Sequence, residues 1–536
     1  VLIPALGLPA VAECADTAAL DAVVPLPAGT EQRAAVISVQ SKLEDVRALE
    51  ATGQYGAALP GAREVAAAAR TLPYPPLRAE ALHTLSSIED DLGHLEQSAG
   101  TARDGALAAG ESHDDALIVQ GLLDVMWSHG RQAKYEEAMA LATAIEVVLA
   151  RSAAVSGAQS ASPGGAQAPA SALPHGERRT LRASYLATKG RLLTDQGKYA
   201  EAAAALEQSL TLREQVVGPE HWRLAAALNS LGEVLRATGR YDEALARFER
   251  ARQITERALG PEHPNVGAIL NNIGAVYEGQ SKHDLSKAMY EQSLRIDEAT
   301  FGADHPRVAI SLLNLGALLD GQARSAEAVP YFERALVIQR RVNGERHPDV
   351  AMSLHNLALA EVHLGKAEAA LPRFRQALSI LEEALPPDHL NVSMPMMGIG
   401  DALVAQRRFG EAVGHYERAL AIQAKVLGED SMDLGYALQG LSKANLAAGR
   451  VGPAVIAAER MVASYTKHGG DLDNRAIADF LLAQALWAAG TDRKRALELS
   501  RHARSVLAVS KDREALEVRE AIRELDAWLA TRGGAR

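Results

Sequence analysis

The sequence predicts an all-α solenoid, in which antiparallel helix pairs stack and each pair buries its apolar face against its neighbours. The first observation behind this prediction is a Gly-Pro-Glu-His segment that recurs with a period of 42 residues. A fixed period of this length is typical of solenoids. The second observation is composition: 48% of the 536 residues are hydrophobic but only 4% are aromatic, which suits thin layers better than one large core.

The recurring segment marks the loop between one helix pair and the next. Its Gly suits the end of a helix and its Pro suits the first position of the following helix. The copies are Gly218-Pro219-Glu220-His221, Gly260-Pro261-Glu262-His263-Pro264, Gly302-Ala303-Asp304-His305-Pro306, Gly344-Glu345-Arg346-His347-Pro348, the worn Pro386-Pro387-Asp388-His389 and Gly428-Glu429-Asp430.

The loop histidines also recur, which raises the question of a metal or acid–base site. Successive copies lie one unit apart, at a spacing of about 10 Å, whereas the ligands of one ion lie about 2 Å from it. We therefore interpret these histidines as structural parts of a capped loop and expect no metal and no cofactor. They are His221, His263, His305, His347 and His389.

Three registers inside each unit predict two closely packed helices. Small residues allow the helices to approach, and a bulky residue one turn after the second small register fills the space beside them. The first small register is Gly190, Gly232, Gly274, Gly316, Ala358, Gly400 and Ser442; the second is Ala202, Ala244, Ser286, Ala328, Ala370, Ala412 and Ala454; the bulky register is Leu206, Phe248, Tyr290, Phe332, Phe374 and Tyr416.

This pattern resembles the tetratricopeptide repeat (TPR), whose helix pairs carry small, Ala and aromatic residues at these offsets. The common TPR unit has about 34 residues, and the longer unit with its Gly-Pro-Glu-His-Pro loop resembles the variety found in kinesin light chains. The resemblance covers about residues 177–466. It implies a superhelical solenoid that binds a protein or peptide ligand in its concave groove.

Less regular parts flank this array. Residues 152–176 are rich in Ser, Ala, Gly and Pro, which predicts a flexible linker and a preferred site of proteolysis. In the last helix, Leu516, Ile522, Leu525 and Leu529 form an apolar stripe that suits a cap. We divide the chain into a lead-in segment (1–30), irregular TPR-like helix pairs (31–151), the linker (152–176), the regular array (177–470), and a closing helix pair with its capping helix (471–536).

A second resemblance lies near the start of the chain. Cys14-Ala15-Asp16, Val24-Pro25-Leu26-Pro27 and Leu77-Arg78-Ala79-Glu80-Ala81, followed by the long repeats, resemble the tail of certain bacterial serine/threonine protein kinases. In that family a kinase domain precedes a helical region and TPRs. The kinase sequence motifs themselves are absent from this sequence, which begins with Val rather than Met, and we expect it to be part of a longer protein.

Net charge limits the kinds of partner that the chain can bind, and cysteine content indicates its compartment. The net charge of −11, with no basic run, argues against nucleic acid and anionic membranes. The single cysteine, Cys14, excludes an internal disulfide and suits a reducing compartment, so we expect a cytoplasmic chain. The apolar residues 1–12 are too short to span a bilayer. The expected partners are a protein or peptide ligand, or another copy of the chain.

Asparagines along the predicted first helices are the candidate ligand-binding residues. Asn272, Asn314 and Asn356 repeat at 42 residues, and Asn is unfavourable inside a helix unless it has a specific role. In the long-repeat TPR family, such residues face the groove and bind the backbone of a peptide. The alternative, that they tie adjacent helices together, stays open. Asn229 and Asn271 occupy the neighbouring register.

A second candidate register lies one turn earlier. It contains flexible methionines, which suit an adaptable peptide-binding surface, although methionine filling a gap around Pro395 is an equal alternative. The register comprises Ile310, Met352, Met394 and Tyr436, with Met396 and Met397 beside it.

Taken together, the sequence predicts a non-catalytic peptide- or protein-binding scaffold that is the regulatory or docking tail of a bacterial serine/threonine kinase. A free-standing TPR adaptor is the alternative. A hydrolase in the N-terminal third is a remote alternative, because only scattered acid–base residues support it. These are His83, Asp90, Asp91, His94 and His113.

Overall fold

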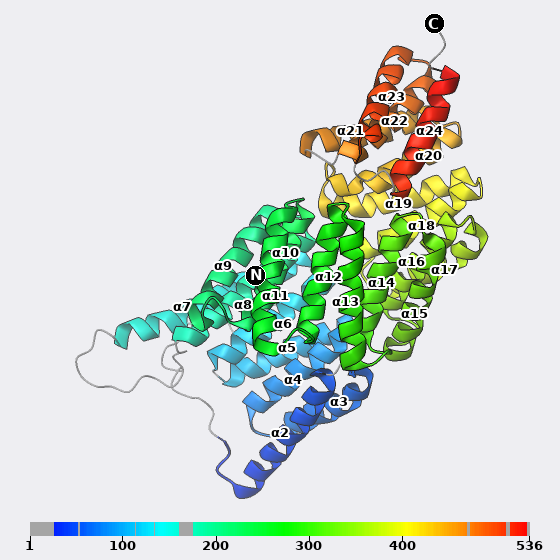
Figure 1. Ribbon diagram of the computed structural model, residues 1–536. Coiled ribbons are helices and arrows are strands. Elements are labelled where there is room, and N and C mark those ends of the chain that lie inside the picture. Colours follow the sequence, from blue (N-terminus) through cyan, green and yellow to red (C-terminus); the bar gives the residue numbers. More distant parts are fainter. Residues whose placement is uncertain are drawn as a thin grey trace. The chain divides into compact units, whose positions relative to one another are not determined.

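The computed structural model describes residues 26–51, 54–112, 114–132, 134–159, 175–468, 472–510 and 515–532, and every regular element in these ranges is helical (Figure 1). The predicted all-α class is therefore confirmed. Within the same ranges, no helix combines the length and the apolar character that a membrane span requires.

The chain forms two compact units, residues 1–279 with 295–305, and residues 280–294 with 306–536. Helix α13 (His283–Phe301) contributes to both. The helices of unit 1 are α2 (Thr30–Ala51), α3 (Tyr55–Thr71), α4 (Pro75–Asp91), α5 (Leu95–Ser112), α6 (Asp115–Arg131), α7 (Tyr135–Gln159), α8 (His175–Asp195), α9 (Tyr199–Val217), the 3-10 helix η2 (Trp222–Leu224), α10 (Ala225–Ala237), α11 (Tyr241–Leu259) and α12 (Pro264–Gly279).

Unit 2 continues with the same kind of helix pair. Its helices are α14 (Pro306–Gly321), α15 (Ser325–Asn343), α16 (Pro348–His363), α17 (Ala367–Ala384), α18 (Leu390–Ala405), α19 (Phe409–Leu427), the 3-10 helix η3 (Met432–Leu434), α20 (Gly435–Ala447), α21 (Val451–His468), α22 (Leu472–Ala489), α23 (Arg493–Ala508) and α24 (Leu516–Arg532).

Within each unit, consecutive helices pack as pairs and the first helix of one pair also contacts the first helix of the next. In unit 1 this second kind of contact joins α4 to α6, α6 to α8, α8 to α10 and α10 to α12. In unit 2 it joins α14 to α16, α16 to α18, α18 to α20 and α20 to α22. Each unit is thus a stack of helix pairs, as expected for a solenoid.

The small and bulky registers explain why the two helices of a pair pack so closely. A Cβ added to Gly232 would lie 2.6 Å from the ring of Phe248, and one added to Gly400 would lie 2.7 Å from the ring of Tyr416. Both rings are at most 1% exposed. Carbon atoms in contact are normally about 3.5–4.0 Å apart, so only glycine leaves room for these rings.

Two further registers close the turns. Between the helices of a pair the backbone adopts a positive φ at Gly239 and Gly365, and also at the non-glycine residues Ser281, Ala323 and Arg407. Only glycine adopts such angles without strain. At the end of a 42-residue repeat, the backbone combines φ of 83° to 93° with ψ of 152° to 168°, as at Gly218, Gly260, Gly344 and Gly428.

The loop histidines have a defined structural task, which is to cap the next helix. At four of these histidines, the backbone N–H two residues later donates to Nδ1 at 3.1 Å. The N-cap position favours a side chain that accepts such a bond. In the last loop, Ser431 accepts the equivalent bond from Asp433 N–H at 3.3 Å. The histidine caps are His221, His263, His347 and His389.

Two predicted boundaries differ from the structure or fall outside it. Helix α7 continues to Gln159 and α8 begins at His175, so the ends of the predicted linker, including residues 152–159, are helical. Ala153 and Ala154 favour this continuation because alanine has the highest helix propensity. The remaining linker residues, 160–174, and the lead-in residues 1–25 lie outside the described residues.

The predicted apolar stripe of the capping helix α24 is buried only in part, since Leu516, Ile522 and Leu529 are half-buried. The buried side chains are Val518, Ala521, Leu525 and Trp528, whereas of the predicted stripe only Leu525 is fully buried. The helix is rotated because the large ring of Trp528 packs edge-on against two aromatic rings of α22, with centroids 6.1 Å and 5.4 Å away. These rings belong to Phe480 and Trp487.

Candidate binding groove of the second unit

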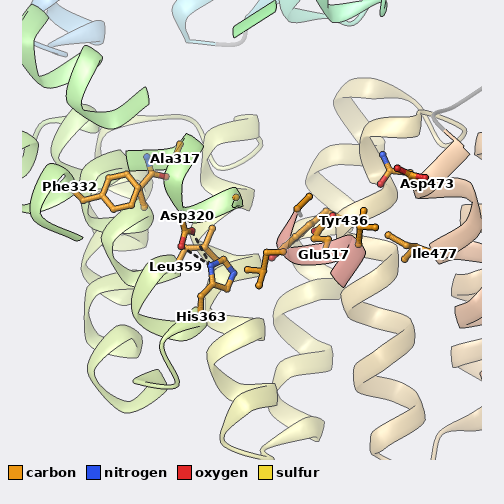
Figure 2. A pocket seen from close by; sticks show the side chains of 15 residues that line it. Ala317, Asp320, Phe332, Leu359, His363, Tyr436, Asp473, Ile477 and Glu517 are labelled. Atoms are coloured by element: carbon orange, nitrogen blue, oxygen red, sulfur yellow. Dashed lines mark hydrogen bonds and ion pairs between the residues drawn. The ribbon is translucent and has the colours of Figure 1, made fainter. Parts of the chain in front are cut away.

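The first helices of unit 2 line a pocket of about 400 Å³, which we call the groove pocket (Figure 2). Figure 2 shows Asp320 and His363 in contact on one side, Asp473 and Ile477 on the other, and Tyr436 and Glu517 between them. Its walls come from α14, α16, α20 and α22, together with the beginning of α24. Residues far apart in the chain therefore meet in one place.

One predicted asparagine lines this pocket. Asn356 lies on α16, one turn before Leu359 and two turns before His363, and both of these residues line the pocket with it. Asn314 precedes the lining residue Ala317 on α14 by one turn, which places both on one helix face. Both asparagines are half-buried. Asn272 is half-buried on α12 of unit 1.

The second candidate register, one turn before the asparagines, contributes its last member to the groove pocket. Tyr436 lines the groove pocket and keeps 41% of its surface exposed. Ile310 is 52% exposed, while Met352 and Met394 are half-buried. Met396, beside Pro395, is 1% exposed and therefore belongs to the core.

The register of Asn229 and Asn271 also contains residues that pack between helices. His355 is 8% exposed and its ring packs edge-on against Phe374 of the second helix α17, with centroids 5.4 Å apart. Burial lowers the pKa of His355 to about 4. Met397 accepts a long hydrogen bond from Gln423 of α19 at 3.7 Å.

Both asparagines of this register are half-buried in unit 1, on α10 and α12. The side-chain oxygen of Asn229 is enclosed and has no hydrogen-bond partner among the described residues.

The sequence analysis missed the charged side chains of the groove. Asp320 and His363 form an ion pair, with His363 Nδ1 3.0 and 3.1 Å from the two carboxylate oxygens. Burial of the imidazole opposes protonation, but the hydrogen bond and charge of Asp320, with Asp401 and Glu520 nearby, outweigh it and raise the pKa of His363. This edge of the groove therefore favours a protonated histidine.

Asp401 lies at the centre of a second polar cluster. It accepts hydrogen bonds from the hydroxyls of Tyr416 at 2.5 Å and Tyr436 at 2.8 Å. Burial raises the pKa of Asp401, while these two hydrogen bonds act in the opposite direction. The pKa values of both tyrosines lie well above 10, mainly because of burial and then because of the Asp401 charge. The tyrosines therefore stay neutral donors.

A neighbouring pocket of about 250 Å³ extends the groove towards Lys443 and the acidic face of α24. Asp401 and Lys443 occupy one 42-residue register with Ala317 and Leu359. The same register holds Arg191 and Glu233 earlier in the chain, so charged side chains recur along it, and this was a signal that the sequence did contain. The part that α24 plays left no such signal, because this helix lies outside the repeat.

The scattered residues of the N-terminal third do not converge on one site. His83 lies 2.6 Å from Asp124, and this hydrogen bond raises the pKa of His83. Asp90 instead accepts from Trp127 Nε1 at 3.3 Å. His113 lies outside the described residues. Within the described ranges, no group of three or more His, Cys, Asp or Glu side chains is placed to hold a metal ion.

Several solved structures are similar to this chain. No curated protein matches the chain. The TPR-like repeats of a kinesin-light-chain-like protein from Podosopora anserina are 28% identical over 38% of this chain and 96% of theirs, with a TM-score of 0.33. BtubC (BKLC) from P. vanneervenii is 20% identical over 47% of this chain and 92% of its own, with a TM-score of 0.33.

A Rap protein complexed with competence and sporulation factor is 14% identical over 77% of this chain and 99% of its own, with a TM-score of 0.43. The family evidence comes from the repeats themselves. Two tetratricopeptide-repeat families match residues 182–223, 223–299, 267–338, 322–383 and 391–467, which is over half of the chain. The chain therefore belongs to the tetratricopeptide-repeat family.

Proposed function

We propose that the chain is a non-catalytic scaffold whose first-helix groove in unit 2 binds a segment of a partner protein. TPR proteins generally mediate protein–protein interaction, and this fold is typically non-catalytic. The observation that carries the proposal is the groove pocket, where Asn356, Leu359 and Tyr436 offer an amide, an apolar surface and an exposed ring. Polar groups placed beside apolar surface in a pocket are typical of sites that orient a ligand.

The asparagines that repeat every 42 residues, Asn272, Asn314 and Asn356, which we call the asparagine ladder, give this proposal a specific form. Asn314 and Asn356 occupy equivalent positions on the neighbouring helices α14 and α16 of unit 2. An amide carries both a donor and an acceptor, as does each peptide group of an extended ligand. We therefore propose that these two residues hold the backbone of the ligand at successive points, and that Asn272 has the same role on its own unit.

The test begins with a peptide selected on the intact chain from a displayed random library. The double variant Asn314→Ala, Asn356→Ala should weaken its binding by about 1–3 kcal/mol, roughly 5- to 150-fold, because each net hydrogen bond contributes about 0.5–1.5 kcal/mol. Asn343→Ala is the matched control, since it removes a half-buried asparagine from the second helix α15.

Two outcomes separate a ligand-binding ladder from a structural one. A ligand-binding ladder predicts weaker peptide binding and an unchanged melting temperature, because Ala is the better helix former. A structural ladder predicts the reverse, with unchanged peptide binding and a melting temperature several degrees lower. The second result would contradict the proposed role of both asparagines.

A finer proposal concerns the protein around this chain. The resemblance of Cys14-Ala15-Asp16 and Leu77–Ala81 to kinase tails supports a docking role beside a bacterial serine/threonine kinase domain in signalling, with a cytoplasmic location; a free-standing adaptor is the alternative. Reading the gene upstream of Val1 tests this proposal. A kinase domain in the same reading frame would support it, and a start codon directly before Val1 would refute it.

A further inference from the structure

The last helix of unit 2 reaches back to the first pair of that unit. Helix α24 contacts α22 and α23, the pair that precedes it, and also contacts α14. Figure 1 shows it in red alongside α22 and α23. A helix that only covered the end of the stack would contact the final pair alone. This helix also enters the space that the first helices enclose.

The two halves of α24 are held differently. In the second half, Leu525 is fully buried, Trp528 packs on the aromatic rings of α22, and Asp526 pairs with Arg504 of α23 at 2.5 Å. In the first half, Leu516 and Glu517 line both the groove pocket and the neighbouring pocket. The second half is thus anchored by aromatic packing and an ion pair, whereas the first half buries the smaller side chains Val518 and Ala521 and lies beside about 400 and 250 Å³ of open space.

The acidic side chains of α24 share one pocket with a lysine and a histidine of the groove, and also with Asp401. Glu517, Glu520 and Glu524 are exposed and line the pocket that also contains Lys443 and His363. Their spacing of three and four residues places them on one face of the helix. Burial raises the pKa of Glu517 and the charge of Asp401 adds to this, whereas the positive charges of Lys443 and His363 act in the opposite direction.

We propose that the first-helix groove of unit 2 is a receptor for an acidic amphipathic helix of a partner protein, and that α24 is the internal helix which this partner displaces. The inference rests on the proposed binding function of the groove. It is carried by what the groove already holds: a helix with an apolar Leu516 and three glutamates facing Lys443 and His363. An amphipathic helix laid in a groove is a common mode of recognition.

Competition between α24 and a partner predicts a simple dependence of affinity on how firmly α24 is anchored. The apparent dissociation constant equals the intrinsic one divided by the fraction of chains whose groove is open. Loosening the anchor at Trp528 should increase that fraction. It should leave Lys443 and His363 in place, because Trp528 itself lines neither pocket, although its ring contact Phe480 lines the neighbouring one.

The experiment uses the intact chain and a fluorescent synthetic peptide with the sequence of residues 515–532, followed by fluorescence anisotropy. The Trp528→Ala chain should bind the peptide at least about tenfold more tightly than the wild type. Adding Lys443→Glu should remove most of this gain. Lys425→Glu is the matched control, because this exposed lysine lies on the second helix α19 and lines neither pocket.

A second peptide and a second variant complete the test. A peptide with Gln in place of Glu517, Glu520 and Glu524 should bind at least about tenfold more weakly, since like-shaped but uncharged side chains lose the attraction of Lys443. Asp526→Ala breaks the exposed pair with Arg504 and leaves the core intact, so it replaces Trp528→Ala if that variant does not fold.

Several outcomes would overturn the inference. They are equal binding to folded wild-type and loosened chains, equal binding of the acidic and the Gln peptides, and dimerisation of the loosened chain without peptide binding, which would assign the groove to a second copy. The ladder test above stays independent. If library peptides still depend on Asn314 and Asn356 while the α24 peptide does not bind, only the present inference is wrong.

Discussion

Substituting Gly400 by alanine should destabilise unit 2, although alanine normally stabilises a helix. The added Cβ would lie 2.7–2.9 Å from three atoms of the Tyr416 ring. Because carbon contacts normally lie at about 3.5–4.0 Å, the ring would have to move by roughly 1 Å. It has no space in which to do so, since Tyr416 is 1% exposed and its hydroxyl donates to Asp401 at 2.5 Å.

The size of this effect follows from two opposing contributions. Overpacking in a core costs about 1–3 kcal/mol, and a weakened hydrogen bond to a charged acceptor adds to this cost. The higher helix propensity of alanine returns about 1 kcal/mol. We expect a net loss of roughly 1–3 kcal/mol in the free energy of unfolding.

The matched control is Gly414→Ala in the partner helix α19. Nothing lies within 4 Å of a Cβ added there, so this variant should be more stable by about 0.5–1 kcal/mol. Urea unfolding, combined with hydrogen exchange of the amides in α18 and α19, measures both variants and localises the change. Equal stability of the two alanine variants would refute the argument that the glycine register exists to admit the aromatic ring.

Three further predictions concern single residues. Ala323→Gly should raise the free energy of unfolding by about 0.5–1 kcal/mol because Ala323 has φ of 60°, whereas Gly365→Ala, at φ of 74°, should lower it by about 1 kcal/mol; urea titration measures both. Because the pKa of His363 is raised in the folded protein, its pair with Asp320 stabilises the fold fully below the ordinary histidine pKa of about 6.5, and this stabilisation is lost as the pH rises through the folded-state pKa. His363→Gln should therefore lower the free energy of unfolding at pH 6 and have little effect on it at pH 9. The pKa of His355 is lowered instead, so the free energy of unfolding should fall as the pH is lowered from about 6.5 to 4, by roughly 3 kcal/mol at most. His355→Leu should reduce this loss of stability in acid, and urea titrations at several pH values measure it.

The sequence predicted the helix pairs because their determinants are local and repeated. Gly400 and Tyr416 belong to the same pair, and the same contact recurs in other units, as between Gly232 and Phe248. The groove was harder to predict. Asn356 does line the pocket, but its neighbours Asp320 and Tyr436 come from other helix pairs, and Glu517 comes from a helix outside the repeat. Periodicity contains no information about such a contact.

The histidine caps show how a single hydrogen bond can hold a repeated joint. Each cap requires only an acceptor two residues before the backbone N–H that it binds, and the last loop supplies this acceptor with the hydroxyl of Ser431. Replacing His221, His263, His347 or His389 by alanine should therefore cost about 1 kcal/mol at that joint, and replacing it by serine should cost less. Because the stability of a repeat array is close to a sum over its repeats, the four losses should add together when all four caps are removed. The joints of the array are thus separate and exchangeable parts, and each can be weakened or restored without changing the helices on either side.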